Sequence, residues 1–296
     1  MKTYLFSRLT ALAVAIAGTL GAMLPTAHAQ TTLFGLSFFD NQLISIDTTT
    51  GAGTIVGTGL GVNALGYGIA YRGAQLYTYN SVLDRIQQID TTSGLIASTI
   101  DIGVGNLTGE GDLTFRSDGI GFLSTVFKNG SSTPTNDLYT FNIATNSSTH
   151  IGTTGDVSIN GLAFIGGTLY GVSKDAQPSL YTINQTNGNL SLVGSLGVDM
   201  NSPFLGLSAR SGGGLYTSVD DRLYTLDVAT GTATQVNNDP YTDIGFSSVS
   251  GLAQARSPLT PVPEPGTYGM MGVACLLAVV AARRKLAGLG AIANEV

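Results

Sequence analysis

The side chains of this chain that could carry chemistry are mainly carboxylates placed between repeated segments. From Gln30 to Val262 the sequence contains sixteen Asp and one Glu, against eight Lys and Arg. Four of these acids stand in the longer, more variable connections: Glu110, Asp156, Asp199 and Asp243. Oxygen ligands gathered on one face suit Ca²⁺, a hard cation, and they also suit hydrogen bonding to a polysaccharide. The alternative is a solvated acidic face that keeps the protein soluble, since no segment has EF-hand spacing.

Other reactive groups are scarce, which excludes several classes of catalytic site. The one cysteine of the chain, Cys275, lies in a C-terminal apolar run, and the body from Gln30 to Val262 has one histidine, His150. The body therefore cannot supply a zinc site or a Cys–His pair. No Gly-x-Ser-x-Gly pattern precedes a predicted helix, so the sequence lacks the pattern that marks a serine nucleophile. We expect His150 to be a surface strand residue.

We predict a protein that is not an enzyme, but one catalytic alternative stays open. Two carboxylates can hydrolyse a glycosidic bond when their separation is suitable, and that separation is a three-dimensional property. A glycan hydrolase or lyase that uses loop carboxylates is therefore the rival function. We expect no cofactor apart from Ca²⁺. The acidic body should repel nucleic acid and anionic lipid rather than bind them.

Three short patterns recur along the body at a spacing of about 45 residues, which is typical of four-stranded propeller blades. One strand starts with a leucine or phenylalanine beside a second large apolar residue, with copies at Leu33, Leu76, Phe122, Leu169 and Leu215. A Gly-Leu-Ala-like strand has copies that start at Gly68, Asp112, Gly161, Gly206 and Gly251. Another strand ends in Asp or Asn before a turn, at Asp47, Asp90, Asn142, Asn184 and Asp227.

The repeated Asp and Asn residues resemble a ring of ligands, but a structural role explains them better. Each stands before a turn that is rich in Thr and, in most copies, contains Gly. Asp and Asn side chains bond to their own downstream backbone in such turns, and Gly supplies the positive φ that the turn needs. We therefore predict that these side chains cap turns between two strands.

The order of the patterns predicts how the repeat array closes. The body begins with the strand at Leu33 and finishes with the Gly-Leu-Ala-like strand at Gly251, so one blade must combine both ends. Such a closure removes the exposed edge of an open array. We predict an all-β fold, a five-bladed β-propeller over residues 30–256. An open β-solenoid is the alternative, and it would need capping units that the sequence lacks.

The N-terminal segment has the layout of a secretory signal peptide. A basic start is followed by an apolar stretch over residues 9–24, and Ala27 and Ala29 are the small residues of a cleavage site. We predict a signal peptide over residues 1–29 that a signal peptidase removes. An uncleaved membrane anchor is the alternative. Everything up to Val262 should then face the periplasm or beyond.

The C-terminal segment has three parts in a fixed order. A Pro-rich linker over residues 257–267 carries a short motif, Val262-Pro263-Glu264-Pro265. The prolines remove backbone donors and keep the chain extended, so that an enzyme can grip it. The apolar run over residues 268–282 predicts a transmembrane helix, although it is shorter than the roughly 20 residues of a relaxed span. The basic tail, residues 283–296, should stay cytoplasmic because it contains Arg283, Arg284 and Lys285.

This three-part order resembles the PEP-CTERM sorting signal of Gram-negative bacteria. In that family the integral-membrane enzyme exosortase, which is transpeptidase-like, recognises the motif, and the protein goes to the cell surface or matrix. The resemblance implies that Pro263, Glu264 and Pro265 are recognised and that the basic triplet is the cytoplasmic stop. It also implies an inner-membrane-anchored precursor and an association with exopolysaccharide and biofilm. This chain extends past the basic cluster, whereas family members usually end soon after it.

The sequence as a whole predicts an exported protein of the cell surface or extracellular matrix. Its propeller would act as a non-catalytic binding module, with polysaccharide or another matrix component as the partner. A purely structural surface protein is a further alternative. The three functions differ in what the loops should contain: converging carboxylates for an enzyme, a shallow face with exposed tyrosines for a binder, and neither for a scaffold.

Overall fold

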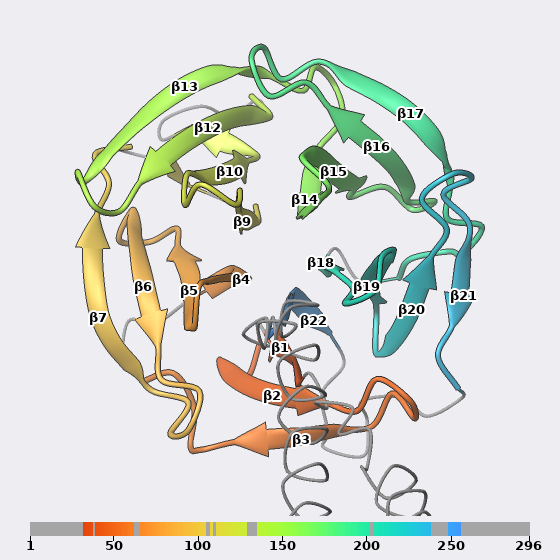
Figure 1. Ribbon diagram of the computed structural model, residues 1–296, viewed down its shortest axis with the longest axis horizontal. Coiled ribbons are helices and arrows are strands. Elements are labelled where there is room, and N and C mark those ends of the chain that lie inside the picture. The colour runs from red at the N-terminus through yellow and green to blue at the C-terminus, as the bar shows by residue number, and fades with distance from the viewer. Residues whose placement is uncertain are drawn as a thin grey trace, which may run out of the picture. The chain divides into compact units, whose positions relative to one another are not determined.

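The computed structural model describes residues 32–37, 39–61, 66–104, 107–108, 111–128, 135–201, 204–237 and 248–255. These residues form five four-stranded antiparallel sheets, arranged as blades around one axis (Figure 1). The prediction of an all-β, five-bladed β-propeller is therefore confirmed. The signal peptide, the Pro-rich linker, the transmembrane helix and the basic tail lie outside the described residues. Within those residues, no helix is long and apolar enough to cross a membrane.

Each blade has four strands, which we letter A to D from the axis outward (Figure 1). The A strands are β4 (Gly66–Arg72), β9 (Leu113–Phe115), β14 (Ile159–Ile165), β18 (Leu205–Ala209) and β22 (Val249–Gln254). The B strands are β1 (Leu33–Ser37), β5 (Gln75–Asn80), β10 (Gly121–Thr125), β15 (Thr168–Ser173) and β19 (Leu215–Val219). The C strands are β2 (Gln42–Ile46), β6 (Arg85–Ile89), β12 (Asp137–Asn142), β16 (Ser179–Ile183) and β20 (Arg222–Leu226). The D strands are β3 (Gly53–Val56), β7 (Ile96–Asp101), β13 (Ser147–Thr153), β17 (Leu190–Ser195) and β21 (Ala233–Gln235).

The ring closes through a blade built from both ends of the body. Strand β22 pairs antiparallel with β1, so the sheet order of this blade is β22-β1-β2-β3. The register joins Leu33 to Gln254 and Leu36 to Gly251. One more backbone hydrogen bond, 2.9 Å from the Ala255 amide to the Thr32 carbonyl, extends the seam. This is the predicted closure, and it excludes the open solenoid.

The antiparallel order sends the connections to two opposite faces. The A–B and C–D turns lie on one face, which we call the turn face; the B–C and D–A connections lie on the other, the loop face. The loop face also carries a small extra sheet, in which β8 (Leu107–Thr108) pairs with β11 (Phe127–Lys128). The sequence did not predict this pair, because strands of two residues have no alternation to detect.

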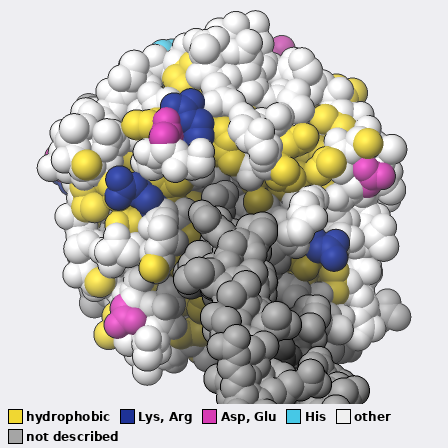
Figure 2. All heavy atoms as spheres, viewed as in Figure 1, with side chains coloured by type: hydrophobic (Ala, Val, Ile, Leu, Met, Phe, Trp, Pro, Cys, Tyr) yellow, Lys and Arg dark blue, Asp and Glu magenta, His cyan; other side chains and the backbone are white. Residues whose placement is uncertain are grey.

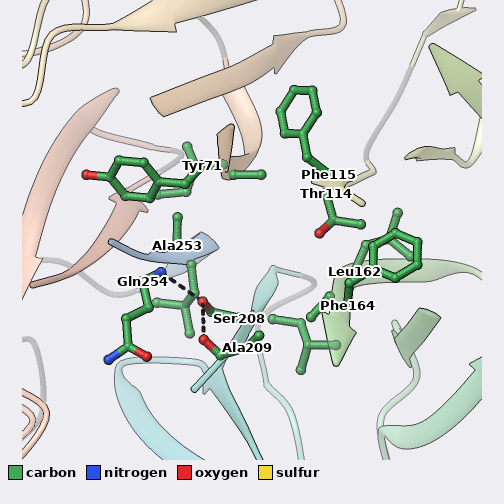
Figure 3. A pocket seen from close by; sticks show the side chains of 14 residues that line it. Tyr71, Thr114, Phe115, Leu162, Phe164, Ser208, Ala209, Ala253 and Gln254 are labelled. Atoms are coloured by element: carbon green, nitrogen blue, oxygen red, sulfur yellow. Dashed lines mark hydrogen bonds between the residues drawn. The ribbon is translucent and has the colours of Figure 1, made fainter. Parts of the chain in front are cut away.

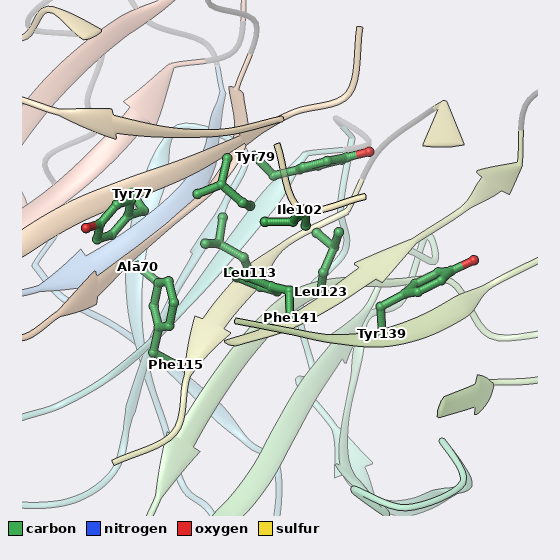
Figure 4. Close-up of a cluster of buried hydrophobic side chains, with 10 residues drawn as sticks. Ala70, Tyr77, Tyr79, Ile102, Leu113, Phe115, Leu123, Tyr139 and Phe141 are labelled. Atoms are coloured by element: carbon green, nitrogen blue, oxygen red, sulfur yellow. The ribbon is translucent and has the colours of Figure 1, made fainter. Parts of the chain in front are cut away.

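The apolar core lies between the blades. All five residues of β1 and of β19 are buried, because a B strand packs on a neighbouring blade through each of its faces. Figure 4 shows one such layer, between the second and third blades. There the Tyr77 and Phe115 rings lie 5.6 Å apart, and Phe115 meets Phe141 edge-on at 5.3 Å. Aromatic pairs at these distances add stability beyond the area that they bury.

The A strands approach one another so closely at the axis that most of them need glycine. A Cβ atom on Gly206 would lie 2.6 Å from the backbone nitrogen of Leu252, in the next A strand of the ring. A Cβ atom on Gly251 would lie 2.7 Å from the Ile69 nitrogen of the strand after that. Distances below 3.0 Å to backbone atoms cannot be relieved by moving a side chain. The glycine of the Gly-Leu-Ala-like pattern is therefore a packing requirement.

The first prediction tests this axial packing. Gly206→Ala should lower the free energy of unfolding by about 1–3 kcal/mol, because overpacking forces the backbone of β22 aside. Chemical denaturation of the two proteins measures the difference. Ser191→Ala, on the exposed face of β17, is the control and should change the free energy of unfolding by less than about 0.5 kcal/mol. A Gly206→Ala protein of unchanged stability would contradict the close approach of the A strands.

Candidate functional site

The predicted carboxylate ligands are separated in the described part of the structure. Asp156 and Asp199 are exposed, in the D–A loops that precede β14 and β18. The Asp199 carboxylate accepts a 3.4 Å hydrogen bond from Gln177. Glu110 and Asp243 lie outside the described residues. Among the residues that are described, no three His, Cys, Asp or Glu side chains group so that they could hold a metal ion. The calcium face stays a prediction.

The repeated Asp and Asn residues act as turn caps. The Asp47 carboxylate accepts hydrogen bonds of 2.7 and 3.1 Å from the Thr49 and Thr50 amides. The equivalent side chains bond in the same way to the amide two residues on, in Asp90, Asn142, Asn184 and Asp227. The amide hydrogen bonds lower the pKa of the Asp47 and Asp90 carboxyls. These side chains serve the C–D turns, as predicted.

His150 lies on the outer strand β13, where the sequence placed it. Its Nε2 atom is 2.9 Å from Oδ1 of Asp137 on β12, and about half of the imidazole side chain is exposed. The ring of Tyr139 packs beside it, with 5.0 Å between the ring centroids. The pair joins two outer strands of one blade and lies away from the axis. This arrangement is a cross-strand contact.

Asp112 is a buried residue whose importance the sequence analysis missed. It occupies the glycine position of the third A strand, and its side chain is fully buried at the axis. One carboxylate oxygen accepts a 2.7 Å hydrogen bond from the Leu113 amide, and the other accepts a 2.7 Å bond from the Leu162 amide of the next blade. A Cβ atom on Gly68 would overlap this carboxylate, so the blade on the other side is also in contact. Asp112 thus joins three consecutive A strands.

The position of Asp112 in the repeat was the signal that could have identified it. The other four copies of the pattern have glycine at this position, where the A strands pack closely. The third copy has aspartate instead. Burial raises the pKa of the Asp112 carboxyl well above its ordinary value and outweighs the two amide hydrogen bonds, which lower it. With both oxygens bonded to backbone amides, the carboxylate has an architectural role.

The axis contains a small cavity (Figure 3). Its walls come from all five A strands, and the hydroxyl of Thr114 points into it. The Ser208 hydroxyl accepts a 2.9 Å hydrogen bond from the Gln254 amide at its edge. The volume is about 40 Å³, which leaves room for a few water molecules and is far below that of a ligand pocket. The axial cavity is therefore too small for a glycan.

Aromatic rings from three blades meet on the loop face. Phe204, just before β18, stacks edge-on with Phe39 of the β1–β2 loop at 5.1 Å, and it lies 6.4 Å from the ring of Tyr67 in β4. Phe204 is buried and Tyr67 is half-buried, whereas Phe39 is 64% exposed. We call these three residues the aromatic cluster. The sequence did not predict it, because its members are far apart in the chain and share no spacing.

Polar groups border the aromatic cluster. Asp40 and Asn41 follow Phe39 directly in the chain, and both are in the exposed β1–β2 loop. On the side of Phe204, the Asp220 carboxylate accepts hydrogen bonds of 3.0 and 2.9 Å from the backbone amide and the side chain of Asn201. An exposed ring beside carboxylates and amides can stack on the apolar face of a sugar and hydrogen-bond its hydroxyls.

Comparison with protein families identifies the C-terminal signal. The family model of the PEP-CTERM protein-sorting motif matches residues 261–285. The motif implies export, a membrane-anchored precursor and processing by an exosortase. It thus agrees with the resemblance of the Pro-rich motif, apolar run and basic triplet. No curated protein matches the chain in sequence.

Solved structures resemble the body in fold. A chain in the crystal structure of a nidogen/laminin complex has a TM-score of 0.51 and 12% identity, covering 77% of this chain and 99% of that one. The gluconolactonase XC5397 from Xanthomonas campestris has 15% identity and a TM-score of 0.48, covering 75% of this chain and 78% of its own. A putative gluconolactonase also has 15% identity, with a TM-score of 0.49 and coverages of 75% and 80%. At 12% identity, the similarity to the first of these chains concerns the fold alone.

The second prediction follows from the buried carboxyl. Folding raises the pKa of Asp112. At pH values between the pKa of the unfolded state and that of the folded state, the folded state still holds a proton that the unfolded state has released. The contribution of this group to the free energy of unfolding is therefore full below the ordinary pKa, and it is lost as pH rises through the higher folded pKa. Above about pH 4 the unsubstituted protein should lose stability with rising pH relative to Asp112→Asn, which cannot ionise. Urea denaturation at a series of pH values measures the two slopes.

Asp118→Asn is the control for this titration. The Asp118 carboxyl is exposed, and the hydrogen bond from Arg116 lowers its pKa. The contribution of Asp118 to the free energy of unfolding is therefore lost only at more acidic pH. The slope between about pH 5 and pH 8 should match that of the unsubstituted protein. Identical slopes for the Asp112→Asn protein and the unsubstituted protein would show that Asp112 ionises normally.

Proposed function

We propose that this protein is a non-catalytic, glycan-binding component of the bacterial cell surface or extracellular matrix. The precursor is exported and membrane-anchored, and an exosortase processes it at the C-terminal signal. The finer steps are part of the proposal: a signal peptidase cuts after Ala29, and the processed protein joins the exopolysaccharide of a biofilm. The propeller presents its loop face to that polysaccharide. Ca²⁺ bound by loop carboxylates would strengthen the contact.

The observation that carries the binding role is the exposed ring of Phe39. A buried neighbour, Phe204, holds it edge-on, so the ring is held in place rather than left loose on the surface. A rigid aromatic platform loses little conformational entropy when a ligand stacks on it. The surrounding carboxylates and amides match the hydroxyl groups of a sugar.

The placement of the reactive groups favours binding over catalysis. Both oxygens of Asp112 bond to backbone amides. The pair of His150 and Asp137 lies on outer strands, away from the aromatic cluster. The axial cavity is too small to hold a sugar ring. A glycan hydrolase or lyase would need two carboxylates near one bound sugar, and the described acids of the D–A loops, Asp156 and Asp199, stand in separate loops.

The third prediction concerns the sorting signal. Replacing Pro263, Glu264 and Pro265 with alanine should leave export intact but keep the protein in the membrane in an unprocessed form, because the exosortase loses its recognition motif. Immunoblots of membrane and extracellular fractions measure the two forms. Replacing Ser257 and Pro258 with alanine is the control, since these residues lie in the same linker before the matched residues 261–285. Normal processing of the altered motif would refute the sorting assignment.

The fourth prediction concerns the aromatic cluster. Phe39→Ala should weaken binding to the exopolysaccharide of the producing cells by about tenfold, or about 1.4 kcal/mol, because the stacking platform is lost. Leu192→Ala removes a side chain of similar exposure from the outer strand β17 and should leave the affinity unchanged. Calorimetric titration, with and without Ca²⁺, measures both.

The same samples distinguish the rival functions. Analysis of the polysaccharide for shortened products detects a hydrolase or lyase. Product formation would overturn the proposal in favour of an enzyme. A complete lack of binding to a panel of glycans would overturn it in favour of a structural surface protein.

A further inference from the structure

The loop face, on which the aromatic cluster lies, carries an excess of negative charge. Each B–C connection contains an aspartate or ends at one: Asp40, Asp84, Asp137, Asp175, Asp220 and Asp221. The ends of the D strands and the D–A loops add Asp101, Asp156 and Asp199. The described bases of this face with placed side chains are Arg85, Lys174 and Arg222. Acids therefore outnumber bases on the described part of the loop face.

The bases of the loop face do not offset this charge. Arg85 pairs with Asp101 at 3.1 Å, and Arg222 lies 3.4 Å from Asp221, so each arginine is already matched to one of the acids. The side chain of Lys174 is half-buried. The remaining carboxylates, among them those beside the aromatic cluster, keep the face negative.

The turn face has no such excess. Figure 2 looks onto this face and shows both dark-blue and magenta side chains spread over it. Its described bases are Arg72, Arg116 and Arg210. Its described acids are Asp47, Asp90, Asp118 and Asp227. The negative charge of the body is thus concentrated on the face that holds the aromatic cluster.

The carboxylates nearest the aromatic cluster are held in place by hydrogen bonds. Asp40 follows the exposed ring of Phe39 directly, and its carboxylate accepts a 2.8 Å hydrogen bond from the Ser37 hydroxyl. On the side of Phe204, the Asp220 carboxylate is fixed by the backbone amide and the side chain of Asn201. Groups that are already ordered lose little entropy when a ligand binds to them. A ligand stacked on Phe39 would therefore meet negative charge that is fixed in position.

The acids of the loop face are dispersed around the ring. Among the described residues, no three His, Cys, Asp or Glu side chains group so that they could hold a metal ion. Dispersed carboxylates suit a ligand whose positive charges repeat along its length, because successive charges can meet successive carboxylates. A cationic ammonium group is also attracted to the face of an aromatic ring such as that of Phe39. Both features favour a polymer of sugars that carry amines.

We propose that the polysaccharide bound at the aromatic cluster is a cationic one, rich in sugars with protonated amines such as glucosamine. The sugar stacks on Phe39, and its amines pair with Asp40 and Asp220. A polymer of uronic acids is repelled by the same carboxylates. This inference rests on the proposed glycan-binding function and names the chemical class of the glycan. Ca²⁺ would use the acids of the D–A loops, which leaves the B–C carboxylates Asp40 and Asp220 to the amines.

Oligosaccharides of equal length separate the effect of charge from the recognition of the sugar. The probes are hexamers of β-1,4-linked glucosamine, of β-1,4-linked N-acetylglucosamine and of galacturonic acid. Each is titrated calorimetrically into the full chain in nonionic detergent, at a pH where the amines are protonated and the carboxylates ionised. The glucosamine hexamer should bind about tenfold more tightly than its N-acetylated form, and the galacturonate hexamer should bind more weakly than both. Salt at about 1 M, where the Debye length is about 3 Å, should abolish the preference for glucosamine.

Two double variants with the same change in charge locate the effect. Asp40→Asn with Asp220→Asn should abolish the preference for the glucosamine hexamer and leave the affinity for the N-acetylated hexamer unchanged. Asp47→Asn with Asp90→Asn removes the same charge from the turn face and should preserve the preference. This control should fold, because asparagine already caps the equivalent turns of two other blades, at Asn142 and Asn184.

The outcomes distinguish this inference from the function on which it rests. A protein that binds none of the hexamers contradicts the glycan-binding function and the inference with it. Equal affinity for the glucosamine and N-acetylated hexamers, or tighter binding of galacturonate, leaves glycan binding standing and overturns the inference alone. The same holds if the two double variants behave alike. If the loop-face variant fails to fold, the salt result on the unsubstituted protein decides, and a preference that persists at high salt refutes the proposal.

Discussion

The structure depends on one steric constraint: five strands must meet at a single axis with no room for side chains at the point of closest approach. Glycine meets this constraint in four blades, and the backbones of Gly206, Gly251 and their neighbours pack at van der Waals distance. The third blade has Asp112 instead, and its carboxylate takes the space that the glycine of the preceding blade leaves open. The axis is thus closed by backbone and by one buried carboxyl. A propeller packed in this way leaves its two faces, and not its channel, accessible to large molecules.

The closed ring also separates the ends of the body from its long loops. Because one blade is made from both ends of the body, the described chain begins and ends on the turn face, and neither of these ends lies on the loop face. The long B–C and D–A connections lie on that free face, where aromatic rings from three blades meet. Antiparallel order alone produces this division. It places both ends of the body on one side of the ring and the long loops on the other.

The strands, their order and the closing blade could be predicted because each repeats a local pattern. Leucine beside an aromatic ring, alternation along the strand and an Asp or Asn before a turn are visible in one stretch of chain. The aromatic cluster could not be predicted, since Phe39, Tyr67 and Phe204 meet only after the blades are arranged in a ring. The role of Asp112 was visible only as an exception to the repeat. The predicted ligands Asp156 and Asp199 were identified by residue type, but their separation depended on the loops.

The seam between β22 and β1 has a mechanical consequence. The inner strands run along the axis (Figure 1), and β22 ends on the turn face. In the sequence, the residues after β22 lead to the sorting signal. A force that pulls the body away from its anchor therefore acts along β22. Its hydrogen bonds to β1, spread over five residue pairs, then bear the load together in shear. Shear breaks such bonds collectively rather than one after another, so the blade that closes the ring is also well placed to resist a pull on the C-terminal end of the body.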